Sequence, residues 1–140
     1  MNAFTPFANS DATRTWLTRL AETAVAAVHP ASLLPDQLPA PPVGRTVVVG
    51  AGKAAAAMAK ALEEAWLARD AQVELSGLVV TRYGHAEPCR HIEVLEASHP
   101  MPDELGEQAA KRMLDAVREL SEDDLVLSLI HISEPARLGM

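Results

Sequence analysis

The sequence lacks the features on which several protein classes depend. It has one cysteine, Cys89, so no disulfide can form within the chain. No apolar run approaches the roughly 18–20 residues that span a bilayer, and the start Met1-Asn2-Ala3-Phe4 does not resemble a signal peptide. A formal net charge of −7 leaves no basic excess for non-specific nucleic-acid binding. We therefore expect a cytoplasmic protein that binds neither membranes nor nucleic acid.

Hydrophobic residues are plentiful and can fill a core. They make up 49% of the 140 residues, a length that suits one domain of ordinary size. A nucleotide-binding domain together with a separate substrate-binding domain does not fit into this length.

The first 44 residues are expected to form a helix followed by a linker. Ser10 or Asp11 can cap a helix that ends near His29-Pro30, because apolar residues recur there at helical spacing. The following segment is rich in proline, which lacks a backbone donor and restricts the residue before it. We predict an extended linker over 30–44, with the helix as an arm that packs on something else.

From Arg45 onwards, short β-branched apolar segments alternate with helix-forming segments. The expected strands are 46–49, 78–81, 92–95 and 125–130, and the expected helices are 53–69 and 103–120. Strands that alternate with helices predict an α/β fold with a parallel sheet and right-handed crossovers.

A glycine turn joins the first strand to the first of these helices. Gly50, Ala51 and Gly52 are followed by Lys53, which adds a full positive charge where a helix N-terminus carries a partial one. This arrangement suits a phosphate or a carboxylate. The spacing is not that of a Walker A loop, but it fits the G-x-G-x-x-A variant of the Rossmann turn, with Glu74 at about the distance of a ribose-binding acid. The alternative is that the glycines only permit a tight turn and Lys53 is solvated.

Two polar segments follow the next two strands, where ligands bind in open α/β sheets. The first is Thr81-Arg82-Tyr83-Gly84-His85, which could equally be a surface turn. The second is Glu96-Ala97-Ser98-His99-Pro100-Met101-Pro102-Asp103. His99 could carry a proton or bind a phosphate, and Asp103 could be a plain helix cap.

The sequence does not predict a metal site. His85, Cys89 and His91 lie close together along the chain but lack the paired spacing of zinc ligands. Cys89 has no evident activating base, so we expect an inert thiol rather than a nucleophile.

Four ordered segments together resemble the N-terminal part of the glycerate 2-kinases. These are class II glycerate kinases with a C-terminal MOFRL domain, and they are sometimes labelled hydroxypyruvate reductases. The likeness covers roughly residues 11 to 130. The segments are 47–55, with the glycine turn, then 79–85, 96–103 and 120–127.

The resemblance implies a Rossmann-like domain and ATP-dependent transfer of a phosphoryl group to the 2-hydroxyl of D-glycerate, with Mg²⁺. Such transfer depends mainly on neutralising charge around the moving group. Lys53 matches the lysine that is thought to supply part of that charge, beside the cofactor-binding residues Gly50, Ala51 and Gly52. His85, Ser98 and His99 match family positions and are assigned to the wall of the cleft.

The C-terminal segment departs from this family. The family continues from Leu-Ile into a glycine-rich loop, whereas here Leu129-Ile130 is followed by His131-Ile132-Ser133-Glu134-Pro135. The segment from Leu127 resembles the translation of a transposon-end sequencing adapter. Between Leu127 and Arg137, only Ala136 differs from that translation. We expect residues 131–140 to be a non-native tail, and a natural alternative ending is the other possibility.

The resemblance and this departure predict three segments, which are the helix and linker of 1–44, a truncated Rossmann-like domain of 45–130, and the tail of 131–140. The parent protein would be a glycerate kinase, and this chain an inactive fragment of it. The alternatives are an NAD(P)H-dependent hydroxypyruvate reductase and a non-catalytic nucleotide-binding module.

Overall fold

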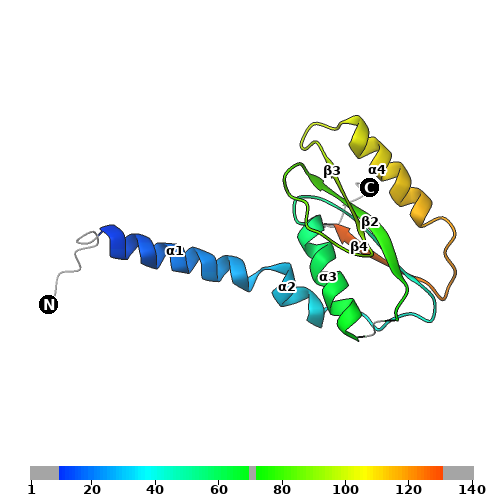
Figure 1. Cartoon of the computed structure of the whole chain (residues 1–140), viewed down its shortest axis with the longest axis horizontal. Coiled ribbons are helices and arrows are strands. Elements are labelled where there is room, and N and C mark those ends of the chain that lie inside the picture. The colour runs from blue at the N-terminus through cyan, green and yellow to red at the C-terminus, as the bar shows by residue number, and fades with distance from the viewer. Residues whose placement is uncertain (1–9, 70–71, 131–140) are drawn as a thin grey trace, which may run out of the picture.

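The computed structural model describes residues 10–69 and 72–130. The elements in chain order are α1 (Ser10–Ala27), α2 (Pro30–Leu33), the short 3₁₀ helix η1 (Leu34–Asp36), β1 (Thr46–Ala51), α3 (Ala55–Arg69), β2 (Leu75–Arg82), β3 (Glu93–Ala97), α4 (Glu104–Ala116) and β4 (Leu125–Ile130). Figure 1 shows one sheet with its helices, from which α1 extends as an arm. Among the helices of these two ranges, none has both the length and the hydropathy needed to cross a bilayer.

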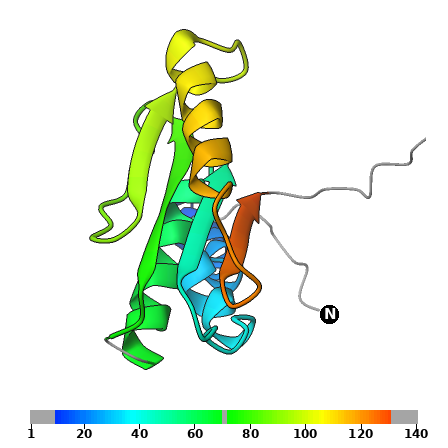
Figure 2. The same ribbon diagram turned by 90° about the vertical axis from the view of Figure 1, so that its right-hand side faces the viewer.

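The four strands form one parallel sheet in the order β3-β2-β1-β4. The chain leaves β1, passes through α3 to β2 and then β3, and α4 brings it back to the other side of β1 as β4. Helices α3 and α4 lie on opposite faces of the sheet (Figure 2). The predicted α/β class and parallel sheet are therefore confirmed. The direction of winding reverses between β1 and β4, which is where open α/β sheets bind ligands at the carboxyl ends of their strands.

The core lies between α3 and the sheet. β1 is β-branched over Thr46–Val49 and is buried along most of its length, as a central parallel strand requires. Leu62 and Trp66 of α3 are 0% and 1% exposed, and they pack with Val48 and Val79 of the two central strands. This packing fixes the helix that follows the glycine turn against the sheet.

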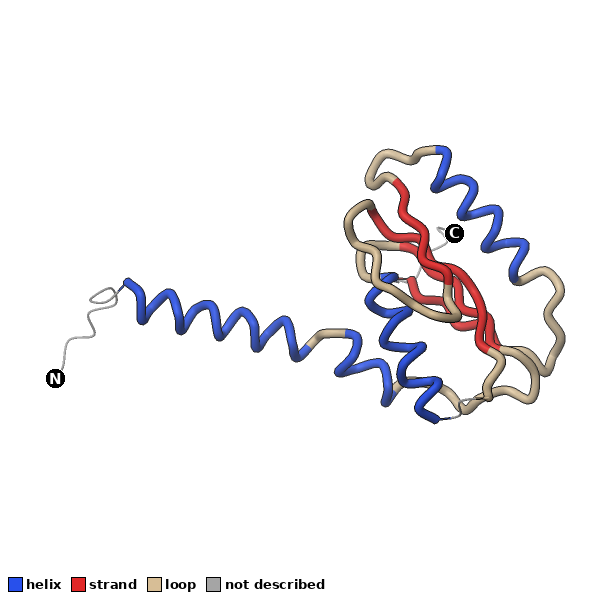
Figure 3. The backbone as a smooth tube through the Cα atoms, in the orientation of Figure 1, coloured by secondary structure: helices blue, strands red, loops and turns tan. Residues whose placement is uncertain are grey.

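The predicted first helix is confirmed, and its apolar face is uncovered. Trp16, Leu20 and Val25 of α1 are 62%, 53% and 63% exposed. Figure 3 shows α1 leading away from the sheet, joined to it through α2.

The expectation of an extended linker is wrong for its first part, because residues 30–36 form α2 and η1. Pro30 and Pro35 each lie in the first turn of one of these helices, where no backbone donor is needed. The Arg69 guanidinium then donates to the carbonyl of Pro35 at 2.8 Å and to that of Pro39 at 2.9 Å. These bonds hold the segment against the end of α3.

Element ends differ from the predicted ones by a few residues. α3 begins at Ala55 instead of 53 because Lys53 and Ala54 belong to the turn, and α4 ends at Ala116 instead of 120. β2 begins at Leu75, three residues earlier than expected, because Gly77 continues the strand at φ 138°. A side chain on Gly77 would collide with the backbone of Val48. The expected tail of 131–140 lies outside the described residues.

Candidate functional site

The glycine turn leads from the end of β1 into α3. Gly52 has φ 128°, a conformation that side chains disfavour, and its N–H donates to the carbonyl of Val80 at 3.0 Å. Its carbonyl accepts from the N–H of Ala55 at 3.1 Å, and the hydroxyl of the buried Thr81 donates to the carbonyl of Lys53 at 3.4 Å. The turn is thereby attached to β2, and its remaining backbone donors are those of Lys53 and Ala54.

The two glycines of the turn have different reasons for lacking a side chain. Gly50 is buried, and a Cβ there would lie 2.6 Å from the carbonyl oxygen of Leu129 in β4. Packing between β1 and β4 therefore explains Gly50 without a ligand. Gly52 has open space beside it, with nothing within 4 Å of a Cβ. Gly52 is therefore the glycine that leaves room for a ligand.

A cavity of 280 Å³ lies at the carboxyl ends of β1, β2 and β3. Four of its polar lining residues are Lys53, Arg82, Ser98 and His99, and Ala51 and Gly52 also line it. The structure thus brings together most of the residues that the sequence singled out. His85 is exposed and is not among the residues that line this cavity.

Glu96 fixes the loop after β2. Its Oε1 accepts from the backbone N–H groups of Gly84 at 2.7 Å, His85 at 3.2 Å and Ala86 at 3.3 Å. A carboxylate that accepts several N–H bonds holds the loop in one conformation. These backbone donors stabilise the carboxylate of Glu96 and fix its position, although they carry no net charge of their own.

Asp103 fixes the loop after β3 and connects it to the loop after β2. As the predicted N-cap of α4, it accepts from the N–H of Gly106 at 2.9 Å through Oδ1. Its Oδ2 accepts from the Tyr83 hydroxyl at 2.7 Å and from the N–H of Ser98 at 3.0 Å. The Tyr83 hydrogen bond, followed by that of Gly106, lowers the pKa of Asp103, and the same bond to Asp103 raises the pKa of Tyr83.

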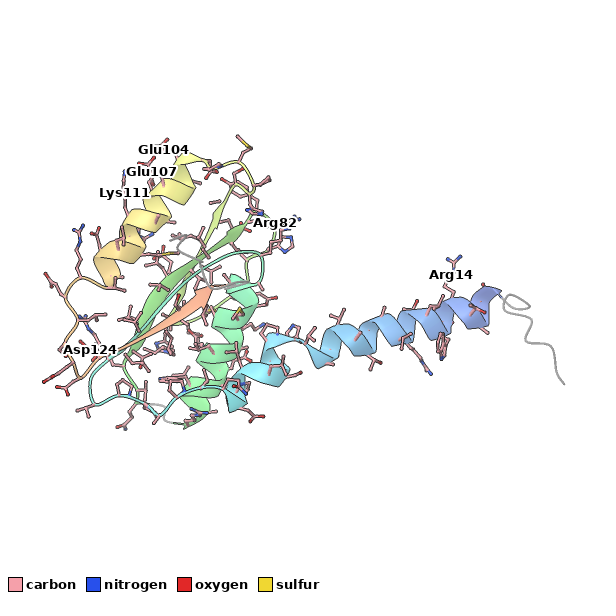
Figure 4. The ribbon with its side chains drawn as sticks, turned by 180° about the vertical axis from the view of Figure 1, so that it is seen from behind. Arg14, Arg82, Glu104, Glu107, Lys111 and Asp124 are labelled. Atoms are coloured by element: carbon pink, nitrogen blue, oxygen red, sulfur yellow. The ribbon has the colours of Figure 1, made fainter. Side chains whose placement is uncertain are left out.

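Arg82 is a candidate site residue that sequence reasoning did not select. It ends β2, lines the cavity beside Lys53, and is exposed. In Figure 4 it lies at the same end of the domain as the first turn of α4, whereas Asp124 lies at the opposite end. Its position at the carboxyl end of a parallel strand was the signal in the sequence that could have identified it.

Glu74 does not occupy the place of a ribose-binding acid. It precedes β2, and its carbonyl accepts from the N–H of Thr46, where β1 begins. The whole of β1 therefore separates Glu74 from the glycine turn. The number of residues between the glycine turn and Glu74 suggested a ribose-binding acid. That number does not show at which end of β2 the acid lies.

Cys89 lies away from the cavity, against α3. Burial, and next the carboxylate of Glu63, raise the pKa of its thiol to about 11. The thiol is therefore almost wholly protonated near neutral pH, which agrees with the expectation that it is not a nucleophile.

The residues around the cavity offer no metal site. Within residues 10–69 and 72–130, no group of three or more His, Cys, Asp or Glu side chains could hold a metal ion. Mg²⁺ takes oxygen ligands. The sequence motifs around the cavity contain two carboxylates, Glu96 and Asp103, and both already accept backbone N–H bonds. The described residues do not fit a protein-held Mg²⁺.

Comparison with known proteins identifies relatives over most of the chain. Residues 16–131 match the family described as "Domain of unknown function (DUF4147)". A protein of Agrobacterium vitis named "Putative hydroxypyruvate reductase" is 52% identical over 122 residues, which are 87% of this chain and 27% of that protein. The D-glycerate 2-kinase of Thermotoga maritima is 40% identical over 107 residues, which are 76% of this chain and 25% of that protein.

A solved structure agrees with the sequence relatives. The crystal structure of glycerate kinase from Thermotoga maritima aligns with a TM-score of 0.66 at 33% identity, over 84% of this chain and 28% of that one. The chain thus spans about a quarter of the length of the relatives that it matches. It belongs to the DUF4147 family, within the group of glycerate 2-kinases and proteins named as hydroxypyruvate reductases.

Proposed function

We propose that this chain supplies one wall of the active site of an ATP-dependent glycerate 2-kinase, with Lys53 as a charged group of that wall. The observation that carries the proposal is the cavity in which Lys53 and Gly52 meet Ser98 and His99. The relatives named as glycerate kinases support the substrate class. The proposed setting is cytoplasmic, with D-glycerate as the small-molecule partner.

The chemistry needs positive charge more than covalent catalysis. ATP would supply the phosphoryl group, whose phosphorus bonds to the 2-oxygen of glycerate as its bond to the bridging oxygen of ADP breaks and the hydroxyl proton is released. The ammonium of Lys53 would hold the transferring phosphate and offset its charge. The turn residues Ala51 and Gly52 would let the ligand approach the backbone.

We also propose that the chain alone is inactive. The chain matches only 25% of the length of the Thermotoga maritima kinase, and the cavity of 280 Å³ beside Lys53 would form part of a larger site. The segments 1–44, 45–130 and 131–140 remain our proposed division. His85 does not line the cavity of this chain, and we propose it for the cleft wall of the complete site.

The test measures turnover and binding on the same preparation of the chain. We expect no ADP formation from ATP and D-glycerate, no NAD(P)H oxidation with hydroxypyruvate, and weak binding of ADP that K53Q reduces. K111Q is the matched control, because Lys111 lies on the exposed side of α4 and pairs with Glu107. Oxidation of NAD(P)H would favour the reductase and overturn the proposal. Turnover of glycerate would overturn only the claim that the chain is inactive.

A further inference from the structure

Two cations share the cavity, and neither has a partner in the part of the chain that the structure describes. The side chains of Lys53 and Arg82 both line the cavity and make no ion pair or hydrogen bond with residues 10–69 or 72–130. Other cations of this domain are paired, such as Lys60 with Glu87 and Arg112 with Glu93. Single cations such as Arg90 also lack an ion pair within the described residues, but the cavity is lined by two of them together.

The acids at this end of the domain are engaged with other groups. Glu96 accepts the three N–H bonds of residues 84–86, and Asp103 accepts from Tyr83, Ser98 and Gly106. On the first turns of α4, Glu104 accepts from Gln108 at 3.2 Å and Glu107 pairs with Lys111 (Figure 4). Each of these carboxylates is thus bonded to another group, and none of them forms an ion pair with Arg82 within the described residues.

Two free cations at one small cavity favour an anion that carries two charges. Phosphate oxygens accept well from both a guanidinium and an ammonium, and the guanidinium can donate two parallel hydrogen bonds to them. The turn adds the backbone donors at the start of α3, where a helix N-terminus attracts negative charge. A single carboxylate can accept from both cations, but its one negative charge would neutralise only one of them.

We propose that Arg82 acts with Lys53 to bind the dianionic phosphate group of a small ligand in this cavity. This inference rests on the proposed function and deepens it, because it adds a second, specificity-determining cation to the site. The phosphate could belong to the polyphosphate tail of a nucleotide or to a phosphorylated sugar acid. The chemistry that Arg82 recognises is the same for both, and different probes distinguish them.

The experiment titrates the full chain with tripolyphosphate, 2-phosphoglycerate and D-glycerate by calorimetry at low salt. We expect at least one phosphate probe to bind more tightly than D-glycerate. R82Q should weaken that binding roughly tenfold or more, since hydrogen bonds to charged groups contribute about 1.5–3 kcal/mol. R82K should recover part of it. Arg14 on α1 lies far from the cavity, so R14Q is the charge-matched control (Figure 4). Unchanged thermal melts would show that R82Q is folded.

Each outcome decides the inference. Tighter binding of tripolyphosphate assigns the cavity to a nucleotide tail, and tighter binding of 2-phosphoglycerate assigns it to a sugar acid phosphate; both support the role of Arg82 if R82Q weakens them. If K53Q weakens binding and R82Q does not, the inference is overturned and the proposed function stands. If the wild-type chain binds neither phosphate probe, both are overturned.

Discussion

The hydroxyl of Tyr83 donates a hydrogen bond of 2.7 Å to Oδ2 of Asp103, which joins the loop after β2 to the start of α4. Asp103 also accepts from Ser98, so the two loops that form the cavity wall are held by one carboxylate. The positions of Arg82 and His99 therefore depend on a residue that does not itself line the cavity.

Asp103 makes stability depend on pH in acid. Its pKa is lowered in the folded chain by the bonds from Tyr83 and Gly106. The contribution of Asp103 to the free energy of unfolding is therefore present above the ordinary aspartate pKa of about 3.9. It is lost as the pH falls through the lowered pKa of the folded chain. Urea midpoints measured from neutral pH to about pH 3 should fall less steeply for D103N than for the wild type. D115N, at an exposed pair with Arg118, should keep the wild-type slope. If the urea midpoints of D103N and the wild type fall equally steeply with pH, the carboxylate of Asp103 does not stabilise the fold in this way.

Glu63 is a buried carboxylate that holds the segment before β3. It is 5% exposed and accepts the N–H groups of Arg90 and His91, each at 2.7 Å, and of Ile92 at 3.1 Å. Because Glu63→Leu would leave these donors without an acceptor, we expect a loss of about 3 kcal/mol or more in the free energy of unfolding. Its exposed neighbour supplies the control, since Glu64→Leu should change stability by less than about 1 kcal/mol. Similar unfolding midpoints for both variants would contradict the role of Glu63.

The two tryptophans should differ sharply when truncated. Trp66 is 1% exposed in the core, and Trp16 on α1 is 62% exposed. Trp66→Ala should cost about 3–5 kcal/mol of unfolding free energy, whereas Trp16→Ala should change it by no more than about 0.5 kcal/mol. Urea unfolding followed by circular dichroism measures both without a fluorescent reporter. A large loss for Trp16→Ala would mean that α1 packs against the domain.

Cys89 should react slowly with iodoacetamide while the chain is folded. Burial, followed by Glu63, raises the pKa of its thiol to about 11, and an unfolded cysteine has a pKa of about 8.5. At about pH 8 the thiolate fraction is therefore roughly two hundredfold lower in the folded chain than in urea. Mass spectrometry of timed samples gives the two rates. Equal rates in buffer and in urea would show that the thiol is not perturbed.

The alternation of strands and helices was predictable because it depends on local pattern. Segments such as Thr46–Val49 are β-branched and apolar, and Asp103 precedes a helix-forming run, so both could be assigned from neighbouring residues. The linker was mispredicted because prolines are compatible with the first turn of a helix as well as with extended chain. The longer β2 was missed because Gly77 interrupts its apolar pattern.

The polar contacts between distant segments could not be predicted in the same way. Glu63 looks like an ordinary acidic residue of a helix, and only the fold brings it to residues 90–92, which lie 27 to 29 positions away. Likewise, Arg82 could be recognised as an unpaired cation only from the fold, which shows that the nearby acids accept bonds from backbone N–H groups. A sequence shows that these acids are present, but it does not show which donors they accept.

The proposed function and the role of Arg82 both depend on phosphate binding in the cavity beside Lys53 and Arg82. Amide chemical-shift mapping by NMR, with tripolyphosphate and 2-phosphoglycerate as probes, tests it most directly. We expect saturable shifts at Gly52, Lys53, Arg82 and Ser98, with none around Asp124 at the opposite end of the sheet. Shifts that are absent, or that gather around Asp124 or along α1, would contradict it.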